Sequence, residues 1–68
     1  MVRIEELKHV MDQQGLNISS LASKSGVDKA VISRLLNGET VSCSIGTAHK
    51  LSDALGLSGK QAAYIFLA

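Results

Sequence analysis

The sequence has no proline, one cysteine and only two aromatic residues, Tyr64 and Phe66. Without proline, no residue interrupts a helix by lacking its backbone N–H. A single cysteine cannot form an internal disulfide, which excludes a stapled secreted scaffold and favours a reducing, cytoplasmic setting. The longest apolar run covers only residues 62–68, whereas a membrane-spanning helix needs roughly 18 or more apolar residues. Glu5 and Glu6 precede any apolar stretch, which argues against a signal peptide.

An excess of one charge is also lacking. Seven Lys or Arg residues stand against six Asp or Glu residues, for a net charge of +1. This balance gives no global indication of a nucleic-acid partner. Split along the chain, residues 1–16 carry a net charge of −1, while residues 17–39 and residues 40–68 each carry +1. We therefore expect the positive potential to be modest and to lie away from the N-terminal segment.

The length of 68 residues sets a further limit. A chain of this size forms one domain, here residues 1–68, and on folding buries about 60% of the surface that its unfolded chain exposes. It has no room for a catalytic cleft between two layers. No Ser/His/Asp or Cys/His set, paired carboxylates or glycine-rich phosphate loop is apparent, so we expect neither an enzyme nor a cofactor.

The periodicity of the apolar residues predicts an all-α fold, a compact bundle of five short helices. The expected caps and stops are Gly15 after the first helix, Asn17 and Gly26 around the second, Asp28 and Asn37-Gly38 around the third, Ser44 and Gly56 around the fourth, and Ser58 before the fifth. The residues expected on the apolar sides are Ile4, Leu7, Val10, Met11, Leu21, Ala22, Val31, Ile32, Leu35, Leu36, Ile45, Ala48, Leu51, Ala54, Leu55, Ala62, Ile65 and Phe66.

The most informative stretch is residues 15–38, which describes two short helices joined by a tight turn at Gly26. Glycine suits this turn because it adopts a positive φ without strain. If the third helix buries Ile32 and Leu35, then its opposite face turns outward. The residues on that outer face are Lys29, Ala30, Ser33 and Arg34.

This stretch resembles the helix-turn-helix of the phage repressor and Cro group, the XRE family. The matching positions are Leu16, Leu21-Ala22, Gly26-Val27, Ile32-Ser33-Arg34, Leu35 and Asn37-Gly38, followed by Thr47, Lys50-Leu51 and Ala54-Leu55-Gly56-Leu57-Ser58. The resemblance covers nearly the whole chain and implies a lambda-repressor-like domain that binds DNA, with the helix from Asp28 to Asn37 in the major groove.

The resemblance also implies roles for individual residues. The expected base contacts are Lys29, Ala30, Ser33 and Arg34, and the expected phosphate contacts are Asn17, Ser19, Thr40 and Ser42. Arg34 suits a bidentate contact to guanine, and Ala30 offers only a methyl group, which suits a thymine methyl. Asn17 and Ser19 stand at the start of a helix, where free N–H groups favour an anion.

Two positions depart from the family pattern. The family commonly has Gln in place of Ile18, where it contacts phosphate and braces the reading helix. Family members often carry an Arg and a Glu, joined as an ion pair, in place of Met11 and Leu36. Because both partners are replaced by apolar residues, no charge is left unpaired, and we expect these two side chains to pack together.

Other residues admit plainer interpretations. His9 and His49 lack neighbours at metal-ligand spacing, and Cys43 has no histidine near it in sequence, so we expect no metal site and no reactive thiol. Tyr64 and Leu67 are expected to be partly exposed, and exposed apolar residues often mark a partner surface. Together with Ile18 they are candidates for a subunit or partner contact.

The sequence thus predicts a small cytoplasmic transcription regulator of phage or bacterial type, Cro-like or a repressor, that binds a palindromic operator as a homodimer. The alternative is a helix-turn-helix protein that acts through protein contacts, as an antirepressor or co-repressor bound to a partner repressor, or as an antitoxin. Ile18, Ala30 and the low net charge motivate this alternative.

Overall fold

The computed structural model describes residues 2–39 and 44–67, and in these ranges it contains helices and no strands. The helices are α1 (Ile4–Gln13), α2 (Ile18–Ser25), α3 (Lys29–Leu36), α4 (Ile45–Leu55) and α5 (Gly59–Phe66). The predicted all-α bundle of five short helices is confirmed. Within the described ranges, none of these helices combines the length and hydrophobicity needed to cross a membrane.

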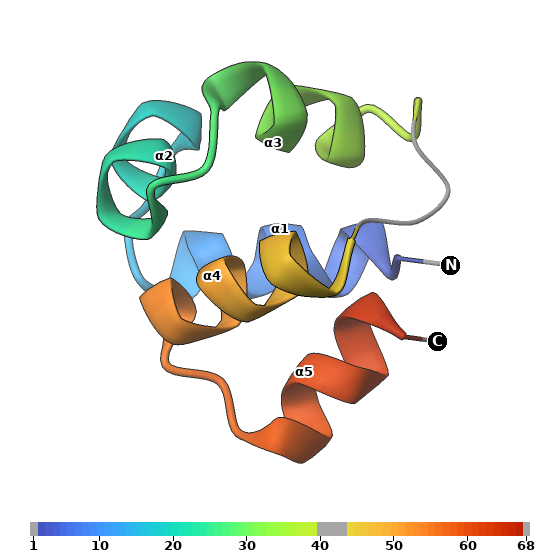
Figure 1. Ribbon diagram of the computed structural model, residues 1–68. Helices are drawn as coiled ribbons and strands as arrows, with labels where there is room; N and C mark the ends of the chain where they lie inside the picture. Colours follow the sequence, from blue (N-terminus) through green and yellow to red (C-terminus); the bar gives the residue numbers. More distant parts are fainter. Residues whose placement is uncertain (1, 40–43, 68) are drawn as a thin grey trace.

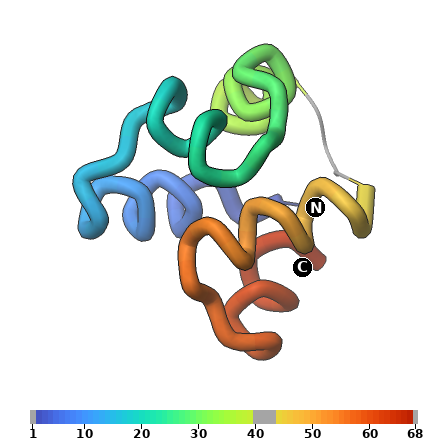
Figure 2. Tube along the Cα trace, turned by 60° about the vertical axis from the view of Figure 1, so that its left-hand side comes forward, coloured from blue at the N-terminus to red at the C-terminus, as the bar shows by residue number. Residues whose placement is uncertain are grey.

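The helices form a compact arrangement in which α1 and α4 lie between the other elements (Figure 1). Helix α2 packs on α3 and α4, α1 packs on α3 and α5, and α5 also packs on α4. In both Figure 1 and Figure 2, α3 lies at one end of the molecule and α5 at the other. The outer surface of α3 is therefore remote from α5.

The core consists of one apolar stripe from each helix. The side chains that are almost completely enclosed are Leu7, Leu21, Ile32, Leu35 and Leu51. Val27, in the turn after α2, is buried beside them, so the turn is held by packing as well as by its backbone conformation. Most of the predicted apolar residues are buried or half-buried, as expected.

Ile45 does not follow that expectation. The helical pattern predicts it on the apolar side of the fourth helix, yet its side chain is 75% exposed. It is the first residue of α4, and it borders a hollow between α4 and α5. Helical periodicity places Ile45 on the side of α4 that faces α5, but the two helices do not close over it.

The helix ends follow the predicted caps. The Asn17 side chain accepts from the Ser20 N–H, and the Asp28 carboxylate accepts from the Ala30 N–H at 2.8 Å. Ser44 and Ser58 cap α4 and α5 in the same way. Each cap satisfies an N–H group that has no partner inside its own helix, so short sequence signals suffice to determine where these helices begin.

The first residues of the chain are held against the last helix. The Arg3 N–H donates to the Ile65 carbonyl at 2.7 Å, and the Arg3 side chain donates from Nε to the Tyr64 carbonyl at 3.0 Å. Its guanidinium also lies 4.4 Å from the centroid of the Tyr64 ring, within the range of a cation–π interaction. Val2 is buried next to this contact, which joins the two ends of the domain (Figure 1).

Gly26 provides a test of the turn between α2 and α3. Its φ of 75° lies in the left-handed region, and a Cβ there would meet no atom within 4 Å. Gly26→Ala should therefore destabilise the fold through backbone strain alone, by about 1–2 kcal/mol. For a domain of this size, each 1 kcal/mol corresponds to a fall in Tm of about 4–8 °C.

Gly46→Ala is the matched control, because Gly46 lies in α4 with no positive φ and with equal space around it. Alanine favours a helix more than glycine does, so this variant should melt at the same temperature or higher. Equal losses of Tm in the two variants would contradict the assignment of the cost to the turn.

Candidate nucleic-acid interface

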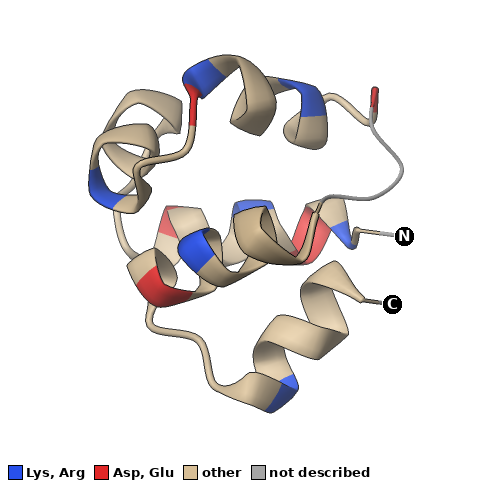
Figure 3. Cartoon of the chain, in the orientation of Figure 1, with Lys and Arg blue, Asp and Glu red and all other residues tan. Residues whose placement is uncertain are grey.

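The outer face of α3 is set by the burial of its inner face. Ile32 and Leu35 are buried against the core, whereas Lys29, Ala30 and Arg34 are exposed. These exposed positions recur at the helical period and form one continuous surface on α3. Figure 3 shows one cation at the start of this helix and one toward its end, on the side of the molecule away from α5. The predicted outer row of α3 is thus present.

Ser33 lies at the edge of that surface. Its side chain is half-buried, and its hydroxyl accepts a hydrogen bond from the Asn37 side-chain amide at 3.4 Å. Asn37 is exposed at the C-terminal end of α3, where the sequence predicts only a helix stop. The structure adds its amide to the polar groups on this face, and the spacing of four residues from Ser33 was the signal available for this pairing.

The start of α2 presents a second polar surface. The Asn17 side-chain oxygen caps the helix by accepting from the Ser20 N–H, and the Ser20 hydroxyl accepts from the Asn17 N–H. The amide nitrogen of the Asn17 side chain takes no part in this capping box, and Ser19 is exposed beside it. A helix start with its N–H groups directed outward favours an anion.

Residues 6–61 match the model of the Cro/C1-type helix-turn-helix DNA-binding domain family. The chain belongs to this family. No curated protein matches the sequence at a significant level. Membership identifies the chain as a DNA-binding regulator in general and makes DNA its partner, in agreement with the resemblance on which the sequence-based expectation relied.

The charge around this candidate interface is modest. Lys29 and Arg34 are the cations of α3, and Lys24 lies in the last turn of α2. Asp28 adds a negative charge next to Lys29, but its carboxylate accepts the Ala30 N–H and so serves as the helix cap. Because the Asp28 carboxylate is engaged in capping the start of α3, Lys29 is left available to a partner.

Thr40 and Ser42, the remaining predicted phosphate contacts, lie outside the described residues, as does Cys43. The other two residues considered for chemistry, His9 and His49, are exposed. Within residues 2–39 and 44–67 no group of three or more His, Cys, Asp or Glu side chains is arranged to hold a metal ion.

The residues that depart from the family pattern all border one hollow. Met11, Ile18 and Leu36 line the same hollow between α1, α2 and α3. Met11 is buried, and the other two are half-buried and pack against the core. The structure thus brings Met11 and Leu36 to the border of one hollow, and a direct contact between the two side chains stays a prediction. Ile18 contributes to the packing against the core, and its role in a partner contact stays a prediction.

Tyr64 and Leu67 lie on different sides of α5. Tyr64 is 52% exposed and borders a hollow next to α1, while Leu67 is 67% exposed and borders the hollow next to α4. The partial exposure that the sequence predicted is confirmed for both residues. However, the structure does not bring them together into one hollow, and the Tyr64 ring already contacts Arg3.

The apolar replacement of the family's ion pair can be tested by restoring the charges. Met11→Arg alone places a guanidinium beside Ile18 and Leu36 and should destabilise the fold by about 3 kcal/mol, because the charge has no partner. Adding Leu36→Glu should recover part of that loss, with a coupling of about 0.5–3 kcal/mol in a double-mutant cycle. Urea denaturation of the wild type, of the Met11→Arg and Leu36→Glu single variants and of the double variant measures this coupling. Strictly additive losses would show that the two side chains do not meet.

Proposed function

We propose that the chain is a small transcription regulator, Cro-like or a repressor, that binds operator DNA by placing α3 in the major groove. The observation that carries the proposal is the exposed row of Lys29, Ala30 and Arg34 on a helix whose opposite face is buried. Family membership supports DNA as the partner. The specific regulatory role is inferred from this surface.

The dimensions of α3 suit this role. A major groove about 12 Å wide admits one α-helix, whose diameter with side chains is about 10–12 Å, and α3 offers eight residues to it. In this orientation Arg34 is the candidate for a bidentate contact to guanine O6 and N7. Lys29 contacts guanine or a phosphate, Ala30 contacts a thymine methyl, and Ser33 contributes its hydroxyl at the edge.

Phosphate contacts are proposed for the start of α2. The exposed side chains of Asn17 and Ser19, with the N–H groups of the first turn, provide donors next to the DNA backbone. Thr40 and Ser42 complete the proposed set from the segment between α3 and α4. These contacts position the domain on the duplex, while the α3 side chains read its sequence.

We propose that two copies bind together. One copy offers only a few base contacts and a small number of phosphate contacts, whereas specific DNA binding typically has a Kd of about 10⁻⁸ M or tighter. Two copies on half-sites one helical turn apart double the contacts and match a palindromic operator. Such binding takes place with the DNA in the cytoplasm of a bacterial or phage-infected cell. Its control would come from protein concentration or from competition for the operator.

The role of Arg34 in reading bases is tested with operator-like duplexes selected from a random library. Arg34→Ala should lower the preference for the selected sequence by about 1–3 kcal/mol, because a bidentate base contact is lost. Lys60→Ala is the control, since Lys60 lies at the start of α5, away from α3, and should leave the preference unchanged. An Arg34→Ala protein that still prefers the selected sequence as strongly would exclude the proposed contact.

Salt dependence measures the phosphate contacts separately. The logarithm of the association constant should fall linearly with the logarithm of the salt concentration, with a slope of about −0.9 per phosphate neutralised. If Lys29 contacts a phosphate, Lys29→Ala should make that slope shallower by about one unit and weaken binding to all sequences alike. If Lys29 instead contacts guanine, the slope should persist while the sequence preference changes.

A second function is favoured by the apolar hollow at Ile18. There the family commonly places a glutamine that contacts phosphate, whereas this chain places an aliphatic side chain with Met11 and Leu36. An apolar surface next to the start of α2 suits contact with a protein, such as a partner repressor or a toxin. A pure protein that binds no duplex above nonspecific affinity at low salt, yet binds a purified partner repressor or toxin, would establish this function instead.

A further inference from the structure

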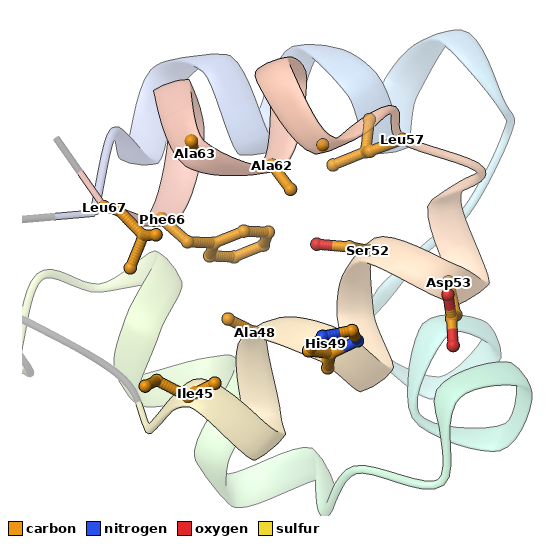
Figure 4. A pocket seen from close by; sticks show the side chains of 11 residues that line it. Ile45, Ala48, His49, Ser52, Asp53, Leu57, Ala62, Ala63, Phe66 and Leu67 are labelled. Carbon is orange, nitrogen blue, oxygen red and sulfur yellow. The ribbon is translucent and has the colours of Figure 1, made fainter.

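A groove between α4 and α5 has no role in the proposed contact with DNA. It has a volume of about 360 Å³ and is lined mainly by apolar side chains. Ala48 and Ser52 line it from α4, and Ala62 and Phe66 line it from α5 (Figure 4). Leu57, between the two helices, closes one end. The groove is open to solvent along its length because the small alanine side chains do not fill the space between the helices.

The two largest exposed apolar side chains near this groove form its rim. Ile45 is 75% exposed and Leu67 is 67% exposed, and both border the groove at the same end (Figure 4). Exposed aliphatic side chains next to an apolar hollow make a continuous apolar patch, which is typical of a protein contact.

The floor of the groove contains an unsatisfied polar group. Ser52 is buried, with only 9% of its surface exposed, and its hydroxyl has no hydrogen-bond partner among the described residues. In Figure 4 the hydroxyl points into the space between the two helices. A serine inside a helix often bonds to the carbonyl four residues earlier, but this one does not. A buried hydroxyl without a partner is unfavourable, so a group that covers the groove and bonds to it would be stabilised.

The exposed edge of α4 beside the groove carries complementary polar groups. Ile45, His49 and Asp53 are four residues apart, so they lie on one face of the helix, and all three are exposed and border the groove. An imidazole donates an N–H, and a carboxylate accepts one. This face therefore holds a donor and an acceptor in a row with an apolar residue at one end.

We propose that this groove is where a second copy of the chain docks, with the two α4 helices antiparallel about a two-fold axis that passes between His49 and Asp53. In that arrangement His49 of one copy lies opposite Ser52 and Asp53 of the other. Ile45 of each copy lies opposite the Leu57 end of the other groove, where Ala62 leaves room. The surface is thus complementary to itself, as a two-fold interface requires.

This inference rests on the proposed binding of DNA by two copies and specifies the surface that joins them. The groove lies between α4 and α5, while α3 is at the opposite end of the molecule from α5 (Figure 1). Dimerisation through the groove therefore leaves the Lys29 and Arg34 side chains free. Tyr64 is excluded from the contact because it faces α1.

The apolar contribution is tested with Ile45→Ser, a change at an exposed residue that should leave the monomer folded. Sedimentation equilibrium of the free protein, and of the protein on a duplex with two half-sites, should show a dimer dissociation constant at least about tenfold weaker. Binding to a single half-site should not change. Tyr64→Ser is the matched control, and it should leave the dimer intact.

The polar pairing is tested by exchanging charges between copies. His49→Asp and Asp53→Lys should each weaken the homodimer, by about tenfold, because each removes both attractive contacts. Mixing the two variants should restore dimers. The carboxylate introduced at position 49 of one copy then meets the amine introduced at position 53 of the other, while the native His49 and Asp53 side chains still pair. Native mass spectrometry of a mixture with one mass-labelled variant distinguishes this heterodimer from either homodimer.

Three outcomes would overturn the inference. The first is a protein that stays monomeric up to about 1 mM and binds two half-sites without cooperativity. The second is a dimer that Ile45→Ser leaves unchanged or that Tyr64→Ser disrupts. The third is a mixture that forms no heterodimer. In each of these cases, unchanged binding of a single half-site would show that the proposed DNA-binding function still holds. Conversely, an intact dimer that binds no DNA would reject the DNA-binding function and leave the proposed dimer surface standing.

Discussion

The proposed interface with DNA depends on the burial of Ile32 and Leu35, which holds α3 in one rotational position. These side chains pack into a core shared with α1 and α2. The positive φ at Gly26 and the buried Val27 then fix the angle at which α3 leaves α2. Burying one face of a helix determines which residues lie on the opposite face. The outward placement of Lys29, Ala30 and Arg34 therefore follows from apolar packing. The proposed recognition surface thus requires few interactions of its own to hold it in place.

Much of the fold was predictable because its signals are local. The starts of α2, α3, α4 and α5 are each marked by a capping residue whose partner lies within three positions, as for Asn17 with Ser20 and Ser58 with Gln61. The link between Arg3 and Ile65 has no such signal, since its partners are far apart in sequence. The exposure of Ile45 was predicted wrongly for a similar reason. Periodicity indicates which side of α4 faces α5, but not how closely the two helices approach each other.

The candidate site, too, was predictable from the sequence only where its signals are local. The outer row on α3 could be predicted because a helix of eight residues with a known inner face has a determined outer face. The hydrogen bond between Asn37 and Ser33 requires the observed rotamers. The groove with Ser52 at its floor depends on the angle between α4 and α5, which no short segment encodes. Tyr64 and Leu67 are close in sequence, yet they border different neighbours.

The contact between the first residues and α5 has a consequence for synthesis of the chain. Val2 and Arg3 leave the ribosome before the Ile65 carbonyl and the Tyr64 ring that Arg3 contacts have been made. The pair of helices α2 and α3 is complete much earlier, although α4, which packs on α2, is still missing. The contact that closes this domain therefore forms only after α5 has emerged, so its native packing is completed late in the synthesis of the domain.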